Sequence, residues 1–173
     1  ALLGFTIEQT KELTLTTKDG RDLPFTGEFT SDATSYADLD CPEVAAFEDV
    51  QDEINYRYHK GTNEKLIVWF HGNGEGDFPV KDTNINVAQI LANRGGAAWV
   101  TYAQSVFGDD HVMAFQAPNM WYFAVKDNLL EPCYNEIQKV IKDNDIDPNE
   151  VYLSGCSAGG FMCTRMIIAY PDL

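Results

Sequence analysis

Five small residues in a row, Gly155-Cys156-Ser157-Ala158-Gly159, place the strongest constraint on the fold of this chain. The apolar segment Val151-Tyr152-Leu153 precedes them, and a helical pattern follows over residues 158–170 until Pro171. A strand that turns sharply into a helix needs glycine on both sides, because a Cβ there would collide with the neighbouring strand or helix. The run therefore predicts a tight strand-to-helix turn with Ser157 exposed and strained at its tip.

This turn makes Ser157 a candidate nucleophile. A serine hydroxyl is a weak nucleophile at neutral pH, so it needs a base and a fixed, exposed position. The G-x-S-x-G turn supplies the position, with Gly155 and Gly159 as the supporting glycines. A frame shifted by one residue would make Cys156 the nucleophile instead, but Ser154 and Ala158 would then replace the two glycines only loosely.

A glycine-rich loop is the second candidate part of a site. Residues 66–70 are apolar at every position, as expected of a strand covered on both faces, and His71-Gly72-Asn73-Gly74 follows at once. Attack on a carbonyl creates an oxyanion, which backbone N–H groups stabilise. We predict the N–H groups of Ala158 and Asn73 as the two donors, with His71, Gly72 and Gly74 as the supporting loop. The alternative is a strand-to-helix turn without a catalytic part.

The remaining pattern predicts an α/β protein. Strands are expected at 54–59, 66–70, 97–102 and 151–153, and helices at 86–94, which Gly95-Gly96 would close, 129–141 and 158–170. The alternation implies parallel pairing with right-handed crossovers, hence a three-layer α/β/α sandwich with a mostly parallel sheet. Residues 103–120 are predicted as loop. A catalytic domain is predicted at 54–173, with residues 1–53 as an extension. The extension is expected to contain a hairpin at 11–30, which turns at Asp19-Gly20 and forms an antiparallel edge of the sheet. An acidic loop with a short helix near 43–50 is expected to follow.

Two segments resemble a known group of proteins. Residues 66–76 (LIVWFHGNGEG) and 146–173, with a D-P-N turn before the strand and Y-P-D after the helix, are similar to the polyhydroxybutyrate depolymerase, feruloyl esterase and prolyl-oligopeptidase-like group of α/β hydrolases. The resemblance covers 54–173. It implies an α/β-hydrolase fold, Ser157 as nucleophile, and Ala158 and Asn73 as oxyanion donors. The expected activity is that of a serine esterase on a small-molecule or polysaccharide-linked ester. A peptidase and a non-catalytic relative stay open.

The chain offers no histidine in the place where this fold keeps its base. The triad order is serine, acid, histidine, whereas His59, His71 and His111 all precede Ser157. We interpret His59 as a polar position on an edge strand, His71 as structural and His111 as part of an irregular loop beside Asp109 and Asp110. We therefore expect this chain to be the front portion of a larger enzyme, trimmed before Ala1, whose acid and histidine lie beyond Leu173.

Composition narrows the partners. The net charge of −15, from 27 acidic and 12 basic residues, disfavours nucleic acid and anionic membranes, and no apolar run approaches the ~20 residues of a membrane span. No cofactor or metal is expected, because the four cysteines form no C-x-x-C pair. A disulfide between Cys41 and Cys133 is left open, as is the compartment, with a secreted or extracytoplasmic location favoured. Residues 121–123 (WYF) are aromatic candidates for lining a cleft.

Overall fold

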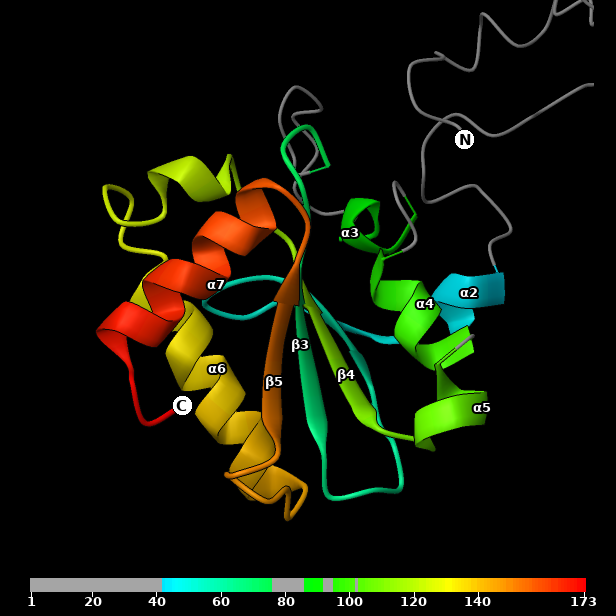
Figure 1. Ribbon diagram of the computed structural model, residues 1–173. Coiled ribbons are helices and arrows are strands. Elements are labelled where there is room, and N and C mark those ends of the chain that lie inside the picture. Colours follow the sequence, from blue (N-terminus) through cyan, green and yellow to red (C-terminus); the bar gives the residue numbers. More distant parts are fainter. Residues whose placement is uncertain (1–41, 76–85, 92–94, 102) are drawn as a thin grey trace, which may run out of the picture. The chain divides into compact units, whose positions relative to one another are not determined.

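The computed structural model describes residues 42–75, 86–91, 95–101 and 103–173, so the hairpin predicted at 11–30 lies outside the described residues. Residues 41–173 form one compact unit. Its centre is a sheet of five strands in the order β1-β2-β4-β3-β5 (Figure 1). The strands are β1 (Glu48–Val50), β2 (Tyr56–His59), β3 (Leu66–Phe70), β4 (His111–Phe115) and β5 (Val151–Gly155).

The sheet is mixed, with a parallel half and an antiparallel half. β3 pairs in parallel with β4 on one side and with β5 on the other, so that Phe70 stands opposite both Phe115 and Gly155. β2 runs antiparallel to β4 and to β1. Because parallel strands end at the same edge, the segments that follow β3, β4 and β5 emerge together at one carboxyl edge of the sheet.

Helices cover both faces of the sheet, giving three layers (Figure 1). Alternate residues of β3 point to opposite sides, as the period of a strand requires. Val68 and Phe70 pack with residues of α6 (Leu130–Asp143) and α7 (Ala158–Ala169). Ile67 and Trp69 pack with residues of α3 (Ala88–Leu91) and α4 (Gly95–Thr101). The expectation of an α/β fold with a doubly covered central strand agrees with this arrangement.

The strand predicted at 97–102 is wrong, because Gly95–Thr101 is the helix α4. Its buried residues are Gly96, Ala97 and Val100, which share one side of a helix at spacings of one, three and four. The two glycines do not close a helix but begin this one. A Cβ on Gly95 would overlap the Trp69 indole ring, so glycine lets α4 lie close against β3.

The loop predicted at 103–120 is also wrong in its middle. It contains α5 (Gln104–Phe107) and β4, whose five residues are all buried, and a 3-10 helix, η2 (Trp121–Phe123), follows. The antiparallel part of the sheet is formed by β1 and β2. The short helix expected near 43–50 is α2 (Pro42–Ala45), and the residues after it form β1. The helices predicted at 129–141 and 158–170 match α6 and α7 closely.

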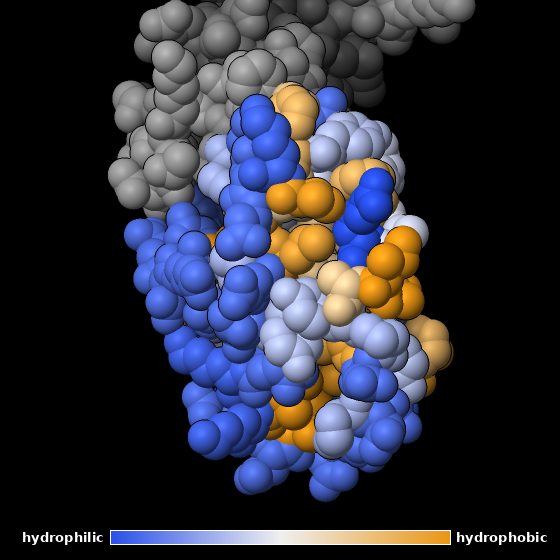
Figure 2. All heavy atoms as spheres, turned by 90° about the vertical axis from the view of Figure 1, so that its left-hand side faces the viewer, coloured by the Kyte–Doolittle hydropathy of each residue, from blue (hydrophilic) through white to orange (hydrophobic). Residues whose placement is uncertain are grey.

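Apolar side chains reach the surface beside the α6 and α7 layer. Ile167 and Ile168 of α7 are 58% and 68% exposed, and Val125 after η2 is 58% exposed. Figure 2 shows this side of the molecule, where hydrophobic residues form a broken band between hydrophilic flanks. Within the described residues, no helix has both the length and the apolar character needed to cross a membrane.

Candidate active site

The turn between β5 and α7 holds Ser157 in a strained conformation. Its φ of 52° and ψ of −109° lie outside the regions that L-residues normally occupy. Such strain costs about 1–3 kcal/mol and persists only where the surrounding structure enforces it. Ser157 is exposed and stands directly before the first residue of α7, so the tip that the sequence predicted is present.

Two glycines allow this turn because backbone packs directly on backbone. A Cβ on Gly155 would lie 2.5 Å from the Gly159 carbonyl carbon. A Cβ on Gly159 would overlap the Phe70 carbonyl oxygen and lie 2.8 Å from the His71 carbonyl oxygen. The Cys156 N–H also donates to the Phe70 oxygen at 3.2 Å. The elbow is therefore pressed against the end of β3, where the glycine-rich loop begins.

The loop after β3 is a tight turn over residues 72–75. The Glu75 N–H donates to the Gly72 carbonyl at 3.4 Å. Asn73 and Gly74 occupy the two exposed central positions, and Gly74 has a φ of 82°, as the second central residue of a type II turn requires. A Cβ on Gly72 would lie 3.5 Å from the Cys156 carbonyl oxygen. The structure thus brings the predicted loop and the predicted elbow side by side.

His71 fastens this loop to the strand next to β3. Its Nδ1–H donates to the Gly72 carbonyl at 2.7 Å, and its Nε2 accepts the Ala117 N–H at 3.0 Å. Because a neutral imidazole has one donor and one acceptor, these bonds occupy both nitrogens. Burial lowers the pKa of His71 to about 4. His71 is therefore neutral near pH 7 and engaged in holding the backbone.

The backbone N–H groups of Asn73 and Ala158 are the two donors predicted for an oxyanion. Neither donates a hydrogen bond to any atom of the described residues. The Ala158 N–H is one of the unpaired donors at the start of a 12-residue helix, where the helix dipole favours negative charge. The turn over 72–75 is closed by the Glu75 N–H and not by that of Asn73. Two backbone donors that lack an acceptor among the described residues, on the two segments that meet at this elbow, suit a developing oxyanion.

The other two histidines lie at the opposite edge of the sheet from Ser157. His111 begins β4 and pairs with Leu66, the first residue of β3, whereas Ser157 follows Gly155, which pairs with Phe70. His111 Nδ1 is 2.5 Å from the Tyr58 hydroxyl. It is a buried strand residue, not part of an irregular loop.

His59 stands opposite Val112, on a strand between β1 and β4, so its interpretation as an edge-strand residue is also wrong. Its Nε2 lies 2.9 Å from the Asp109 carboxylate, and its Nδ1 lies 2.9 Å from the Ala46 carbonyl oxygen. The chain has three histidines, and none of them is placed to deprotonate Ser157.

Two residues near the loop escaped the sequence reasoning. Glu75 is buried, with 7% of its surface exposed, and its Oε2 accepts the Gly72 N–H at 3.2 Å. Gln116, directly after β4, donates to the Glu75 carbonyl at 3.1 Å. Glu75 could have been noticed in the sequence, because it is an acidic residue between two glycines of segment 66–76. Gln116 gave no signal, because β4 itself was not predicted.

The remaining predicted features are placed as follows. Of the aromatic candidates, Trp121 is wholly buried against Phe70 and His71, so it does not line a surface cleft, whereas Tyr122 and Phe123 are exposed. The disulfide left open by the sequence is not formed: Cys133 is a buried free thiol, and Cys41 lies outside the described residues. In the described ranges, no group of three or more His, Cys, Asp or Glu side chains is placed to hold a metal ion.

The comparison with solved structures finds a crystal structure of a thermostable esterase. The two chains are 26% identical, the TM-score is 0.62, and the match covers 76% of this chain but 39% of the esterase. No family model and no curated protein matches the chain. The likeness supports an α/β fold similar to that of the esterase. This chain spans well under half the length of the esterase that it resembles.

Proposed function

We propose that this chain carries the nucleophile and the oxyanion hole of a serine esterase that cleaves carboxylic esters. Ser157 Oγ gives its proton to a base and attacks the ester carbonyl carbon, and the base passes that proton to the departing alkoxide, which leaves as the alcohol. Water, deprotonated by the same base, then attacks the acyl-enzyme, which releases the acid and restores the Ser157 hydroxyl. In both steps the N–H groups of Ala158 and Asn73 donate hydrogen bonds to the carbonyl oxygen, which has become negatively charged. The observation that carries the proposal is a strained, exposed Ser157 between two segments whose backbone donors, Ala158 and Asn73, have no acceptor among the described residues.

The base in this proposal comes from residues outside the given sequence. All three histidines of the chain bind elsewhere, His59 and His111 at the far edge of the sheet and His71 in the loop. A serine without a base reacts slowly, because its hydroxyl stays protonated at neutral pH. We propose that a histidine and an acid from the C-terminal remainder of the same enzyme complete the site, in keeping with the 39% coverage of the esterase.

Labelling with a fluorophosphonate probe tests the nucleophile in the full-length protein. Ser157→Ala is expected to abolish labelling, while Cys156→Ala leaves it largely intact. The 173-residue chain alone is expected to label roughly 10³-fold more slowly or not at all, because the base is missing. Equal labelling of the parent protein and Ser157→Ala would refute Ser157 as nucleophile. Rapid labelling of the chain alone would refute a base from outside it.

Substitutions at Asn73 test the second donor. Asn73→Pro removes the N–H at the first central position of a turn, where proline fits, and Asn73→Ala keeps the N–H as a matched control. We expect Asn73→Pro to lower kcat for p-nitrophenyl acetate by about 10²-fold, which is the usual cost of one oxyanion donor, and Asn73→Ala to lower it little. Equal losses in the two variants would show that the side chain or the turn matters, and not the N–H.

The lack of a histidine beside Ser157 also favours a second candidate, a non-catalytic relative of such esterases. Under this alternative, the full-length protein neither labels with the probe nor hydrolyses p-nitrophenyl acetate. A peptidase predicts a third outcome, in which a dipeptide anilide is cleaved with an efficiency near that of the ester. The proposed esterase strongly prefers the ester, since esters react far more readily than amides.

A further inference from the structure

A buried carboxyl group, that of Glu75, holds the glycine-rich loop through a hydrogen bond. Glu75 Oε2 accepts the Gly72 N–H at 3.2 Å, while the Gly72 carbonyl accepts the Glu75 N–H at 3.4 Å. Glu75 Oε1 would lie 2.9 Å from a Cβ on Gly72, which is itself close to the Cys156 carbonyl. The carboxyl group therefore holds the turn at Gly72, next to the elbow, while Asn73 and Gly74 are exposed.

Gln116 in turn fixes the backbone of Glu75. Its side chain is 1% exposed, and its Nε2 donates to the Glu75 carbonyl at 3.1 Å and lies 3.4 Å from His71 Nε2. Its Oε1 accepts the Gln89 N–H at 3.2 Å. One carboxamide thus links the end of β4, the loop after β3 and the start of α3.

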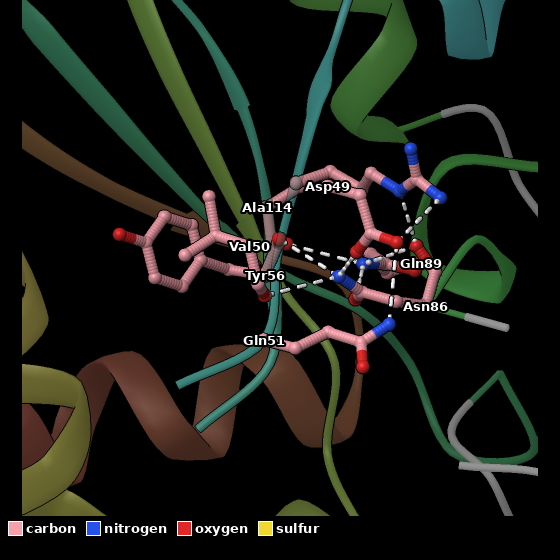
Figure 3. A network of polar contacts seen from close by, with 8 residues as sticks. Asp49, Val50, Gln51, Tyr56, Asn86, Gln89 and Ala114 are labelled. Atoms are coloured by element: carbon pink, nitrogen blue, oxygen red, sulfur yellow. Dashed lines mark hydrogen bonds and ion pairs between the residues drawn. The ribbon is translucent and has the colours of Figure 1, made fainter. Parts of the chain in front are cut away.

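This link ends in a polar network within the antiparallel half of the sheet (Figure 3). Gln89 Nε2 donates to Asn86 Oδ1 at 2.7 Å. Asn86 Nδ2 donates to the Asp49 carboxylate at 2.7 Å and to the Tyr56 carbonyl at 2.8 Å. Figure 3 shows the Asn86 carboxamide directed at the backbone of β1 and β2, with the Gln89 carboxamide beside it, which also donates to the Ala114 carbonyl of β4. The loop is therefore linked through a chain of hydrogen bonds to β1 and β2.

We propose that Glu75 and Gln116 are positioning residues for the reaction on Ser157, which hold the loop so that the Asn73 N–H faces the developing oxyanion. The inference rests on the proposed function and adds two residues to it. Preorganised donors lower the barrier because they need no rearrangement when charge develops. Burial of a carboxyl group costs free energy unless the group is hydrogen-bonded, so the hydrogen bond from the Gly72 N–H to Glu75 offsets part of this cost. Burial raises the pKa of Glu75, in line with that cost.

The test compares Glu75→Leu with Glu75→Gln in the full-length protein. The leucine keeps volume but cannot accept the Gly72 N–H, whereas the glutamine keeps an acceptor oxygen at the same length. We expect Glu75→Leu to lower kcat for p-nitrophenyl acetate about tenfold or more with little change in KM, and Glu75→Gln to stay within about threefold of the parent. Binding of a trifluoromethyl ketone, which forms an oxyanion on Ser157, should weaken in parallel with kcat.

Gln116→Met provides a second measurement that leaves the carboxyl in place, and Glu136→Leu is the matched control. Glu136 is an equally buried carboxyl that binds the Tyr56 hydroxyl from α6, far along the chain from the loop. Gln116→Met is expected to behave like Glu75→Leu. Glu136→Leu is expected to lower the unfolding midpoint while kcat and ketone affinity of the folded protein stay unchanged.

The two proposals fail in different ways. Full activity in Ser157→Ala overturns the proposed function, and the positioning role with it. An inactive Ser157→Ala together with parent-like kcat and ketone affinity in Glu75→Leu and Gln116→Met overturns the positioning role alone. If Glu75→Leu does not fold, Gln116→Met decides between these outcomes by the same two measurements.

Discussion

Two glycine-containing turns meet at the carboxyl edge of the sheet, and they are built on different principles. The elbow at Ser157 is shaped by close packing, because Gly155 and Gly159 let backbone touch backbone. The loop at 72–75 is shaped by side chains, through the His71 imidazole, the Glu75 carboxyl and the Gln116 carboxamide. A Cβ on Gly74 would meet nothing within 4 Å. The shape of the G-x-S-x-G turn is therefore determined mostly within the motif, whereas the shape of the loop depends also on Gln116, which is remote in sequence.

The largest effect is expected at Gly159, where the elbow tolerates no side chain. Gly159→Ala places a Cβ against the Phe70 and His71 carbonyl groups, and backbone atoms cannot move aside as a flexible side chain does. We expect a loss of about 3 kcal/mol or more in the free energy of unfolding, measured by urea titration.

The adjacent Gly160 gives the matched control. A Cβ on Gly160 would have only the Gly155 carbonyl oxygen near it, at 3.9 Å. Gly160→Ala should therefore leave stability unchanged or raise it by up to about 1 kcal/mol, through the better helix propensity of alanine. Similar losses in both variants would show that the elbow is not determined by close packing.

The second effect concerns the loop and depends on pH. The pKa of His71 in the folded protein is about 4, below the usual histidine value of 6.5, because burial disfavours the imidazolium. Between pH 6.5 and 4 the unfolded chain binds a proton that the folded chain does not, so stability falls as pH falls. The free energy of unfolding decreases by about 3 kcal/mol in total through His71, and this decrease is nearly complete at pH 4.

Urea titrations of the parent and of His71→Gln between pH 4 and 7 measure this contribution. The difference between the two proteins isolates His71, because Glu75 and the other acids are common to both. The parent is expected to lose stability relative to His71→Gln as pH falls through this window. Parallel pH profiles would mean that His71 is not held neutral in the loop.

The third prediction concerns the backbone strain at Ser157, which is distinct from the close packing at Gly155 and Gly159. Ser157→Gly relieves a φ of 52° at the tip, whereas Ser157→Ala keeps the strain, and both remove the hydroxyl. We expect the glycine variant to be more stable than the alanine variant by about 1 kcal/mol, after the greater entropy of glycine in the unfolded chain is allowed for. Thermal unfolding of both variants checks this, and equal midpoints would argue against stored strain.

The smallest effect is expected at Gly74, where the backbone has a positive φ but a Cβ would meet no other atom within 4 Å. Gly74→Ala should cost about 1 kcal/mol, because φ is 82° and an L-residue there is strained. Gly74→Asn should cost less, since asparagine tolerates positive φ better. Calorimetric midpoints measure both variants. A loss as large as that of Gly159→Ala would contradict the contrast between the two turns.

The same contrast explains what could be predicted from the sequence. β3, β5, α6 and α7 were predicted because each has a clear local pattern, and the two glycine motifs adjoin β3 and β5. Residues 97–101 were misassigned because a short apolar run fits a strand as well as a helix, and the deciding fact is the packing of Gly95 on Trp69. Missing β4 concealed Gln116, whose partners Glu75 and Gln89 are 41 and 27 residues away in sequence.

The exposure of Cys156 at the elbow has a practical consequence. The other described thiols are less reactive, because burial raises the pKa of Cys133 and raises that of Cys163 to about 11. Cys156 is exposed and directly precedes Ser157. Within the described residues, a maleimide at neutral pH should therefore select Cys156. Its rate of modification would report on anything that covers the elbow.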